Sequence, residues 1–175
     1  IFSKKKDISS DIEIDASNHI VLPGLVNTHH HLFQTLTKAI IKAQNASLFD
    51  WLKILYPIWS RITSEELKSA VKIGLSELMT SGCTTTSDHL YIFPNGIKLE
   101  DEIEVAQTLG IRFHSTRGSM SIGESNGGLP PDYLVEDESF IIKDSQDIIN
   151  KWHDPSHGSM IRIALAPCSP FSVSK

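Results

Sequence analysis

The sequence has few cysteines, no long apolar run and no apolar leader. Its only cysteines, Cys83 and Cys168, lie far apart and form no CxxC pair, so neither a disulfide framework nor a thiolate zinc knuckle is indicated. This cysteine usage favours a reducing cytoplasm. No apolar stretch approaches the roughly 20 residues that span a bilayer, and the opening IFSKKKD lacks the apolar core of a secretory signal. We therefore expect a soluble cytoplasmic protein without a membrane partner.

Positive charge is also scarce. Lys and Arg number 16 against 21 Asp and Glu, which leaves a net charge of -5 with histidine neutral. Such a chain has no positive field to gather phosphates, so a nucleic-acid polymer is not the expected partner and a small neutral molecule fits better. The 40% of hydrophobic residues is typical of a globular protein with a core. Because the chain begins at Ile1 without an initiator methionine, we expect a fragment of a longer protein.

The first 22 residues differ in pattern from the rest. Residues 11–22 alternate apolar and polar side chains around a Ser17-Asn18 turn, which predicts strand material outside the main repeat. After Pro23-Gly24, the apolar run GLVNT predicts a buried strand that ends at His31. We therefore divide the chain into residues 1–22 and residues 23–175.

Residues 23–175 alternate strand and helix patterns. A helix is expected directly after His31, and an aromatic helical excursion follows that should break near Pro57. Thr63 and Glu66 form a capping pattern for the next helix, which should end at Ser81-Gly82. The remaining expected elements are strands at 83–89, 111–117 and 160–168 and helices at 97–110 and 139–152.

Strands that alternate with helices imply parallel pairing through right-handed crossovers. A complete (β/α)8 barrel of the TIM type needs roughly 250 residues, so the predicted α/β fold is the N-terminal half of such a barrel. The alternative is an open doubly wound sheet, but its usual Gly-rich phosphate turn is absent after the first strand. The polar stretch at residues 118–138, rich in Gly and Pro, is too long for an ordinary connector and is a candidate active-site loop.

Three consecutive histidines follow the first predicted strand. In extended backbone, side chains i and i+2 project to the same side, so His29 and His31 can converge on one ion while His30 points away. Neutral imidazole is a favoured zinc ligand, and the carboxyl end of a barrel strand is where such enzymes place reacting groups. The alternatives are a solvent-facing histidine run or core histidines that pair with their neighbours. The position between a buried strand and a helix favours the metal site.

These residues also carry a family resemblance. LPGLVNTHHHLFQTLTKA resembles the opening of the amidohydrolase superfamily, in the branch of aminohydrolases that act on nucleobases and triazines. The blocks SGCTTTSDHLYIFP, RGSMSIGESNGGLPPD and ALAPCSPFSVS are most similar to the deaminases of 8-oxoguanine and isocytosine. The similarity runs from about Ile12 to the end of the chain. Its four blocks fall at the ends of the four predicted strands.

The resemblance implies a barrel joined to a small β-sandwich, of which residues 1–22 would be a remnant. It also implies a metal held by His29 and His31, with further His and Asp ligands and a proton-shuttling Glu beyond residue 175. Two-metal relatives use a carboxylated lysine at the end of strand four, where this chain has Ala166, Pro167 and Cys168. The resemblance therefore implies one divalent metal, Zn²⁺, with Fe²⁺ as the alternative.

Five residues at expected strand ends and nearby loops are candidates for binding substrate. The Gln34 amide offers a donor and an acceptor that complement a ring lactam, and similar enzymes that deaminate guanine-type rings use a glutamine after HxH in this way. The alternative is a solvated helix glutamine. The other candidates are His89, Arg117, Cys168 and Trp51. His89 and Arg117 are equally compatible with structural roles, whereas Trp59 is expected to pack.

Taken together, these features predict a metal-dependent hydrolytic deaminase of a small aromatic heterocycle, 8-oxoguanine or isocytosine, that releases ammonia. The alternatives are a triazine hydrolase and a fragment that binds metal without activity of its own. Related enzymes are often oligomers, so a homo-oligomer is left open.

Overall fold

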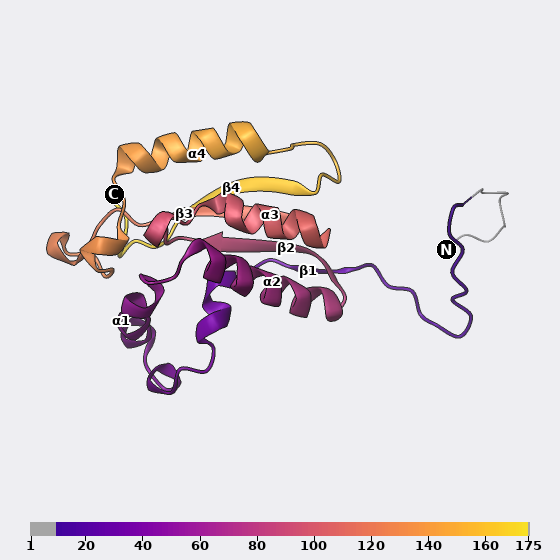
Figure 1. Ribbon diagram of the computed structural model, residues 1–175, viewed down its shortest axis with the longest axis horizontal. Coiled ribbons are helices and arrows are strands. Elements are labelled where there is room, and N and C mark those ends of the chain that lie inside the picture. The colour runs from indigo at the N-terminus through magenta and orange to yellow at the C-terminus, as the bar shows by residue number, and fades with distance from the viewer. Residues whose placement is uncertain (1–9, 175) are drawn as a thin grey trace.

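A computed structural model describes residues 10–174. Its sheet has four parallel strands in the order β1-β2-β3-β4, each joined to the next through helical segments (Figure 1). The strands are β1 (Leu25–Asn27), β2 (Cys83–Leu90), β3 (Arg112–Ser119) and β4 (Ile161–Pro167). The α-helices are α1 (Leu48–Trp59), α2 (Ser64–Thr80), α3 (Leu99–Leu109) and α4 (Glu138–Trp152). The 3-10 helices are Leu32–Thr37, Ile41–Ala43, Pro94–Gly96, Glu124–Asn126 and Asp132–Leu134.

The helices begin and end where the sequence supplies their caps. The Thr63 hydroxyl accepts from the backbone N–H of Glu66, whose carboxylate accepts in return from the N–H of Thr63, so α2 has the predicted capping box. Asp137 caps α4 in a similar way. Gly110 ends α3 in the left-handed region with φ 77°, as expected of a C-terminal glycine.

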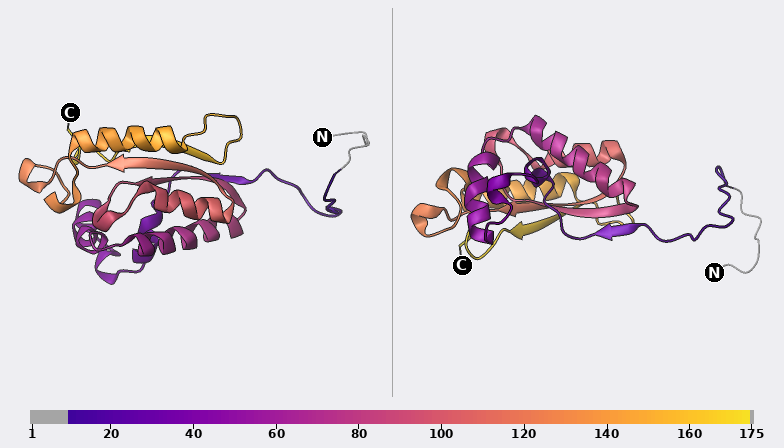
Figure 2. Two further views of the ribbon diagram at one scale, coloured as in Figure 1. Left: turned by 45° about the horizontal axis from the view of Figure 1, so that its top comes forward. Right: turned by 90° about the horizontal axis from the view of Figure 1, so that it is seen from below.

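The helices cover one face of the sheet, and the core lies between them and the strands. The right-hand view of Figure 2 shows the helices gathered on one side of the strands. Alternate strand residues bury their side chains there, among them Leu90, Phe113, Ile161 and Ile163. This one-sided burial is the pattern that a barrel wall produces, with helices outside and strands inside.

The opposite face of the sheet carries polar side chains and is more exposed. Thr85, Ser87 and His89 of β2 lie in register with Arg112, His114 and Thr116 of β3. These residues are half-buried or exposed. In a barrel this face is the interior, so the side chains that reach the mouth from this face are the ones available to a site.

Two local expectations differ from the structure, and a third is confirmed. Strand β1 ends at Asn27, so the histidines follow the strand in extended backbone instead of ending it. The residues after His31 form 3-10 helices rather than an α-helix. Helix α1 ends at Trp59, two residues after Pro57, so the predicted break near this proline is confirmed.

Residues 10–24 contain no strand in the structure. The apolar side chains of this segment are exposed to solvent: Ile12, Ile14, Ile20 and Val21. Ile20 has 88% of its surface exposed. The expected strand at residues 11–22 is therefore wrong, and within residues 10–174 no strand lies beside this segment to pair with it. The assignment of residues 1–22 to a sandwich domain stays a prediction, and residues 1–9 lie outside the described part.

Both cysteines are free thiols, Cys83 buried and Cys168 half-buried. Among residues 10–174, no helix has the combined length and apolar character needed to cross a membrane.

Candidate metal and substrate site

A cavity of about 630 Å³ lies where β2, β3 and β4 reach their carboxyl ends. Its wall combines the histidine segment, one side of α1, the ends of β2 and β4 and the residues after β4. Of the predicted site residues, the cavity is lined by His29, His31, Gln34, Trp51, His89 and Cys168. Segments that are far apart in the sequence thus meet at the mouth predicted for a barrel enzyme.

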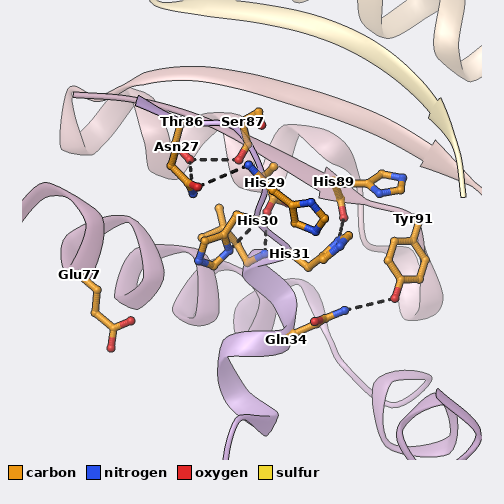
Figure 3. A network of polar contacts seen from close by, with 12 residues as sticks. Asn27, His29, His30, His31, Gln34, Glu77, Thr86, Ser87, His89 and Tyr91 are labelled. Atoms are coloured by element: carbon orange, nitrogen blue, oxygen red, sulfur yellow. Dashed lines mark hydrogen bonds and ion pairs between the residues drawn. The ribbon is translucent and has the colours of Figure 1, made fainter. Parts of the chain in front are cut away.

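His29 and His31 lie side by side on this cavity. Their ring centroids are 5.1 Å apart with the planes near perpendicular, and Figure 3 shows both rings on the same side of the backbone. Extended backbone at His31, with φ -134° and ψ 83°, produces this alternation even though the segment is no longer paired as a strand. The predicted convergence of the two imidazoles is therefore present in the structure.

The donor chemistry of His31 fits a metal ligand. Its Nδ1 lies 2.9 Å from the backbone carbonyl oxygen of His89. Because a carbonyl only accepts, Nδ1 carries the proton and Nε2 keeps its lone pair, as in metal-ligating histidines whose second nitrogen donates to a carbonyl. Burial lowers the pKa of His31, which favours the neutral ring that a metal requires.

His30 points to the other side of the segment, as predicted. Figure 3 shows its ring turned towards Glu77 of α2 and away from the other two histidines. Its Nδ1 lies 3.9 Å from Oδ1 of Asp88. Burial lowers the pKa of His30. His30 also borders the cavity, but its ring lies on the other side of the segment from the rings of His29 and His31.

Strand β2 holds the histidine segment by hydrogen bonds. The Asn27 amide donates to the Thr86 hydroxyl at 3.1 Å, and the N–H of His89 donates to the carbonyl of His30 at 3.0 Å. The N–H of Leu32 donates to the Asp88 carboxylate at 2.6 Å. The direction of the imidazoles is thus determined by β2 as well as by their own backbone.

Gln34 has a partner that sequence reasoning missed. Its Nε2 donates to the Tyr91 hydroxyl at 3.2 Å, and both residues line the cavity (Figure 3). Burial raises the pKa of Tyr91 well above its ordinary value, so the phenol keeps its proton. The sequence spacing could have indicated Tyr91, because it lies two residues beyond His89 and extended backbone places both side chains on one side.

The His89 side chain extends from β2 over β3 towards β4 and forms part of the cavity wall. Its Nε2 is 3.0 Å from the backbone carbonyl of Ala166 at the end of β4, so Nε2 donates and Nδ1 remains an acceptor. Gly118 makes this possible, because a Cβ there would come within 2.6 Å of His89 Nε2, the Leu90 carbonyl and Tyr91. His89 therefore combines the pocket position and the structural partner that the sequence left open.

Cys168 and Trp51 also face the cavity, from the end of β4 and from α1. Burial raises the pKa of the Cys168 thiol, so this cysteine is not an activated nucleophile. Trp59 is fully buried, its indole N–H donates to the Thr37 hydroxyl at 3.0 Å, and its ring meets that of Trp51 edge-on at 5.2 Å. Trp59 packs, as predicted, while Trp51 forms part of the wall.

Arg117 is not a pocket residue, which corrects the prediction. Arg117 lies four residues after Phe113 in β3, so both side chains point to the helix-facing side, and only 2% of the Arg117 surface is exposed. Its guanidinium makes two bonds of 2.9 Å to Glu136 and one of 2.9 Å to Asp144, and it lies over the Phe93 ring. A strand-end position did place Arg117 near the mouth, but the side of the strand directs its side chain outward.

The candidate active-site loop at residues 118–138 borders the cavity. It folds back on itself through two 3-10 turns and hydrogen-bonds to the segment after β4, with Leu129 N donating to Phe171 O at 2.8 Å. Leu129 lies on the cavity wall. Phe171, which follows β4, meets Phe49 of α1 edge-on at 5.2 Å, so the loop is hydrogen-bonded to a residue that forms part of the cavity rim.

Residues 10–174 contain no group of three or more His, Cys, Asp or Glu side chains arranged for one metal ion.

The description of one protein family, the amidohydrolase family, matches residues 20–175. This chain belongs to the amidohydrolase family. Among the relatives of this amidohydrolase, 8-oxoguanine deaminase from Pseudomonas aeruginosa is 52% identical over 93% of the chain and 36% of that protein. Hydroxydechloroatrazine ethylaminohydrolase from Pseudomonas sp. strain ADP is 32% identical over 85% of the chain and 32% of that protein. The chain therefore spans about a third of the length of these relatives.

Solved structures agree with the family. A triazine hydrolase from Arthrobacter aurescens superimposes with a TM-score of 0.83 and 31% identity, over 87% of this chain and 36% of that one. Atrazine chlorohydrolase from Arthrobacter aurescens TC1, solved in complex with zinc, gives a TM-score of 0.81 at 30% identity, with the same coverage. The predicted fold class is confirmed: the amidohydrolase has an α/β fold whose four parallel strands form part of a barrel.

Proposed function

We propose that this amidohydrolase chain supplies one half of the active site of a metal-dependent deaminase that acts on 8-oxoguanine or isocytosine. The observation that carries the proposal is the pair His29 and His31, which share one side of the cavity with their rings 5.1 Å apart. The 52% identity to an 8-oxoguanine deaminase supports the substrate class. Hydrolysis of this substrate would release ammonia and the oxo-heterocycle.

The metal would be a single divalent ion, Zn²⁺, with Fe²⁺ as the alternative. His29 and His31 would hold it, with further ligands outside this chain. When bound, such an ion supplies an activated water nucleophile at neutral pH. Ala166 and Cys168 face the cavity at the end of β4, where a bridging lysine would be needed for a second metal.

Gln34 and Tyr91 would orient the ring. Since Gln34 Nε2 is used towards Tyr91, its Oε1 remains as an acceptor, and the Tyr91 hydroxyl, which accepts from Gln34, keeps its own proton to donate. An adjacent acceptor and donor complement the N–H and C=O of a ring lactam. Trp51 would cover one face of the ring, and Cys168 and His89 would line the wall. Arg117 has no place in this arrangement.

Triazine hydrolysis is the second candidate. It is favoured by the structural likeness to the triazine hydrolase, at a TM-score of 0.83. The same histidine pair serves either leaving group, and the two candidates differ in the ring that Gln34 and Tyr91 must hold. An amino- or chloro-triazine without a ring lactam has ring nitrogens that can accept from Tyr91 but no ring N–H to donate to Gln34 Oε1.

An assay of the full-length natural protein tests the proposal. Ammonia release from 8-oxoguanine, isocytosine, guanine and cytosine should be compared with product release from a chloro-triazine. We expect the highest kcat/KM on 8-oxoguanine or isocytosine. Turnover of the triazine alone would reject the nucleobase substrate.

The 175-residue chain by itself is expected to bind zinc weakly and to release no ammonia, because its described residues offer two imidazoles and no further metal cluster. Robust turnover by this chain alone would show that the site lies elsewhere. The cytoplasmic location and a small-molecule partner are part of the same proposal.

A further inference from the structure

Two buried carboxyl groups lie behind the histidine segment, on the helix-facing side of β2. Asp88 is 1% exposed near the end of β2, and Glu102 of α3 is fully buried. Within residues 10–174, neither carboxyl forms an ion pair with a lysine or an arginine. Buried carboxyls without a counter-ion are costly, so this pair needs a structural reason.

The two carboxyls must share a proton. In the part of the chain that the structure describes, Oδ2 of Asp88 and both oxygens of Glu102 are buried without a hydrogen-bond partner. Asp88 and the Ser115 hydroxyl are near enough to Glu102 to influence its pKa. Two ionised carboxylates in contact away from water would repel strongly. Burial raises the pKa of both, and the nearby Asp88 raises that of Glu102 further, so Glu102 is the carboxyl that favours the protonated form and can donate to Asp88.

Asp88 in turn accepts from the backbone of the metal segment. Its Oδ1 lies 2.6 Å from the N–H of Leu32, the residue directly after His31. Leu32 is fully buried at the start of a 3-10 helix, so its N–H would otherwise be left without a partner. The Asp88 carboxylate therefore fixes the point at which the chain turns away from the cavity.

The neighbouring residue of β2 completes the attachment. The N–H of His89 donates to the His30 carbonyl at 3.0 Å, and the His89 carbonyl accepts from His31 Nδ1 at 2.9 Å. Three hydrogen bonds from two adjacent residues of β2 thus reach residues 30–32 in succession. Loss of the Asp88 bond would free the turn that sets the direction of the His31 ring.

We propose that Asp88, held by Glu102, is a positioning residue for the metal site, because its carboxylate fixes the backbone turn after His31 and thereby the aim of the two imidazoles. This inference rests on the metal site of the proposed function. The role requires a hydrogen-bond acceptor at residue 88 and a donor at residue 102, and it requires no contact with the substrate.

Zinc affinity of the full-length natural protein tests the inference, measured by competition with a chelator and by the visible spectrum of the Co²⁺-loaded protein. Asp88→Ala should weaken zinc binding by about 10- to 100-fold, the usual cost of losing a group that orients a ligand, and should change the Co²⁺ spectrum. Asp88→Asn keeps an acceptor for Leu32 and should bind zinc within a few-fold of the wild type.

Glu102 provides a second pair of variants that does not depend on the folding of Asp88→Ala. Glu102→Gln keeps an N–H donor for Asp88 and should leave zinc affinity nearly unchanged. Glu102→Leu removes the donor and should weaken it. Equal zinc affinity in Glu102→Leu and Glu102→Gln would overturn the role given to Glu102.

Asp101 is the matched control. It is the neighbouring buried carboxyl of α3 and accepts from the N–H of Lys98 at 2.9 Å. Asp101→Ala should lower stability without changing zinc affinity. The inference is overturned if Asp88→Ala binds zinc like the wild type, or if Asp101→Ala weakens binding equally. A wild type that binds no zinc would instead refute the metal site itself.

Discussion

The two faces of the sheet carry polar residues of different kinds. On the helix-facing side, Arg117 is buried, lies outside the cavity lining and binds Glu136 and Asp144. Asp88 is also buried on this side; it borders the cavity, but its carboxylate accepts from the Leu32 N–H. On the interior side, His89 and Thr116 line a cavity at the same strand ends. The comparison teaches that a position at the end of a barrel strand brings a residue close to the site. Whether its side chain points into the site depends on which face of the sheet it occupies in the strand's alternation.

The largest expected effect on stability comes from the helix-facing side. Arg117→Met would leave the carboxylates of Glu136 and Asp144 without their buried partner and should lower the free energy of unfolding by about 3–5 kcal/mol. The KM for substrate should stay unchanged because the guanidinium lies outside the cavity. Urea unfolding and steady-state kinetics of the full-length protein measure the two quantities. An unchanged free energy of unfolding with a raised KM would contradict this account and show that Arg117 contributes to substrate binding.

The two tryptophans of α1 sharpen the same contrast. Trp59→Ala should cost about 3–5 kcal/mol, because the whole indole is buried, whereas Trp51→Ala should cost less and raise KM. Thermal unfolding and substrate titration of both variants provide the measurements. If Trp51→Ala left KM unaltered, the side of α1 that faces the cavity would have no part in binding.

Gly118 of β3 leaves room for the His89 side chain, which passes close to its backbone. Gly118→Ala should destabilise by about 1–3 kcal/mol, because the added Cβ meets backbone and ring atoms that have little room to move, and it should disturb the bond from His89 to Ala166. Gly110→Ala is the control, because no atom lies within 4 Å of its Cβ position. That variant should cost stability through its positive φ alone and leave KM unchanged. Equal KM values for both variants would contradict the account.

The smallest expected effect lies far from the site. Thr63→Ala removes the cap of α2 and should cost about 1 kcal/mol, measured by urea unfolding. The N–H and hydroxyl of Thr63 lower the pKa of Glu66 below its ordinary value. This contribution to stability is present above the unfolded-state pKa and is lost as the pH falls through the lower folded-state pKa. The difference between wild type and variant should therefore shrink in acid; a constant difference would show that the carboxylate does not contribute.

Much of the architecture could be predicted from local signals. The capping box at Thr63 and the stop at Gly110 determined helix ends within one residue, and the β-branched run after Cys83 identified β2. The strand expected at residues 11–22 failed because a strand needs a partner, and the alternation of a sequence does not show whether one is present.

The site was predictable to the extent that it depends on alternation. His29 and His31 converge because extended backbone repeats every two residues. The same rule, applied from the apolar Phe113, would have placed Arg117 on the helix side and Tyr91 with His89. The proximity of Glu102 to Asp88 was beyond sequence reasoning, because it depends on how α3 packs against the sheet and α2.

The metal content of three histidine variants tests the central claim most directly. In the full-length natural protein, His29→Ala and His31→Ala should each lose bound zinc, by more than the about 100-fold that outer-shell changes cost. His30→Ala should keep one equivalent of metal per chain. Zinc retained by His29→Ala and His31→Ala, or lost from His30→Ala alone, would contradict the account.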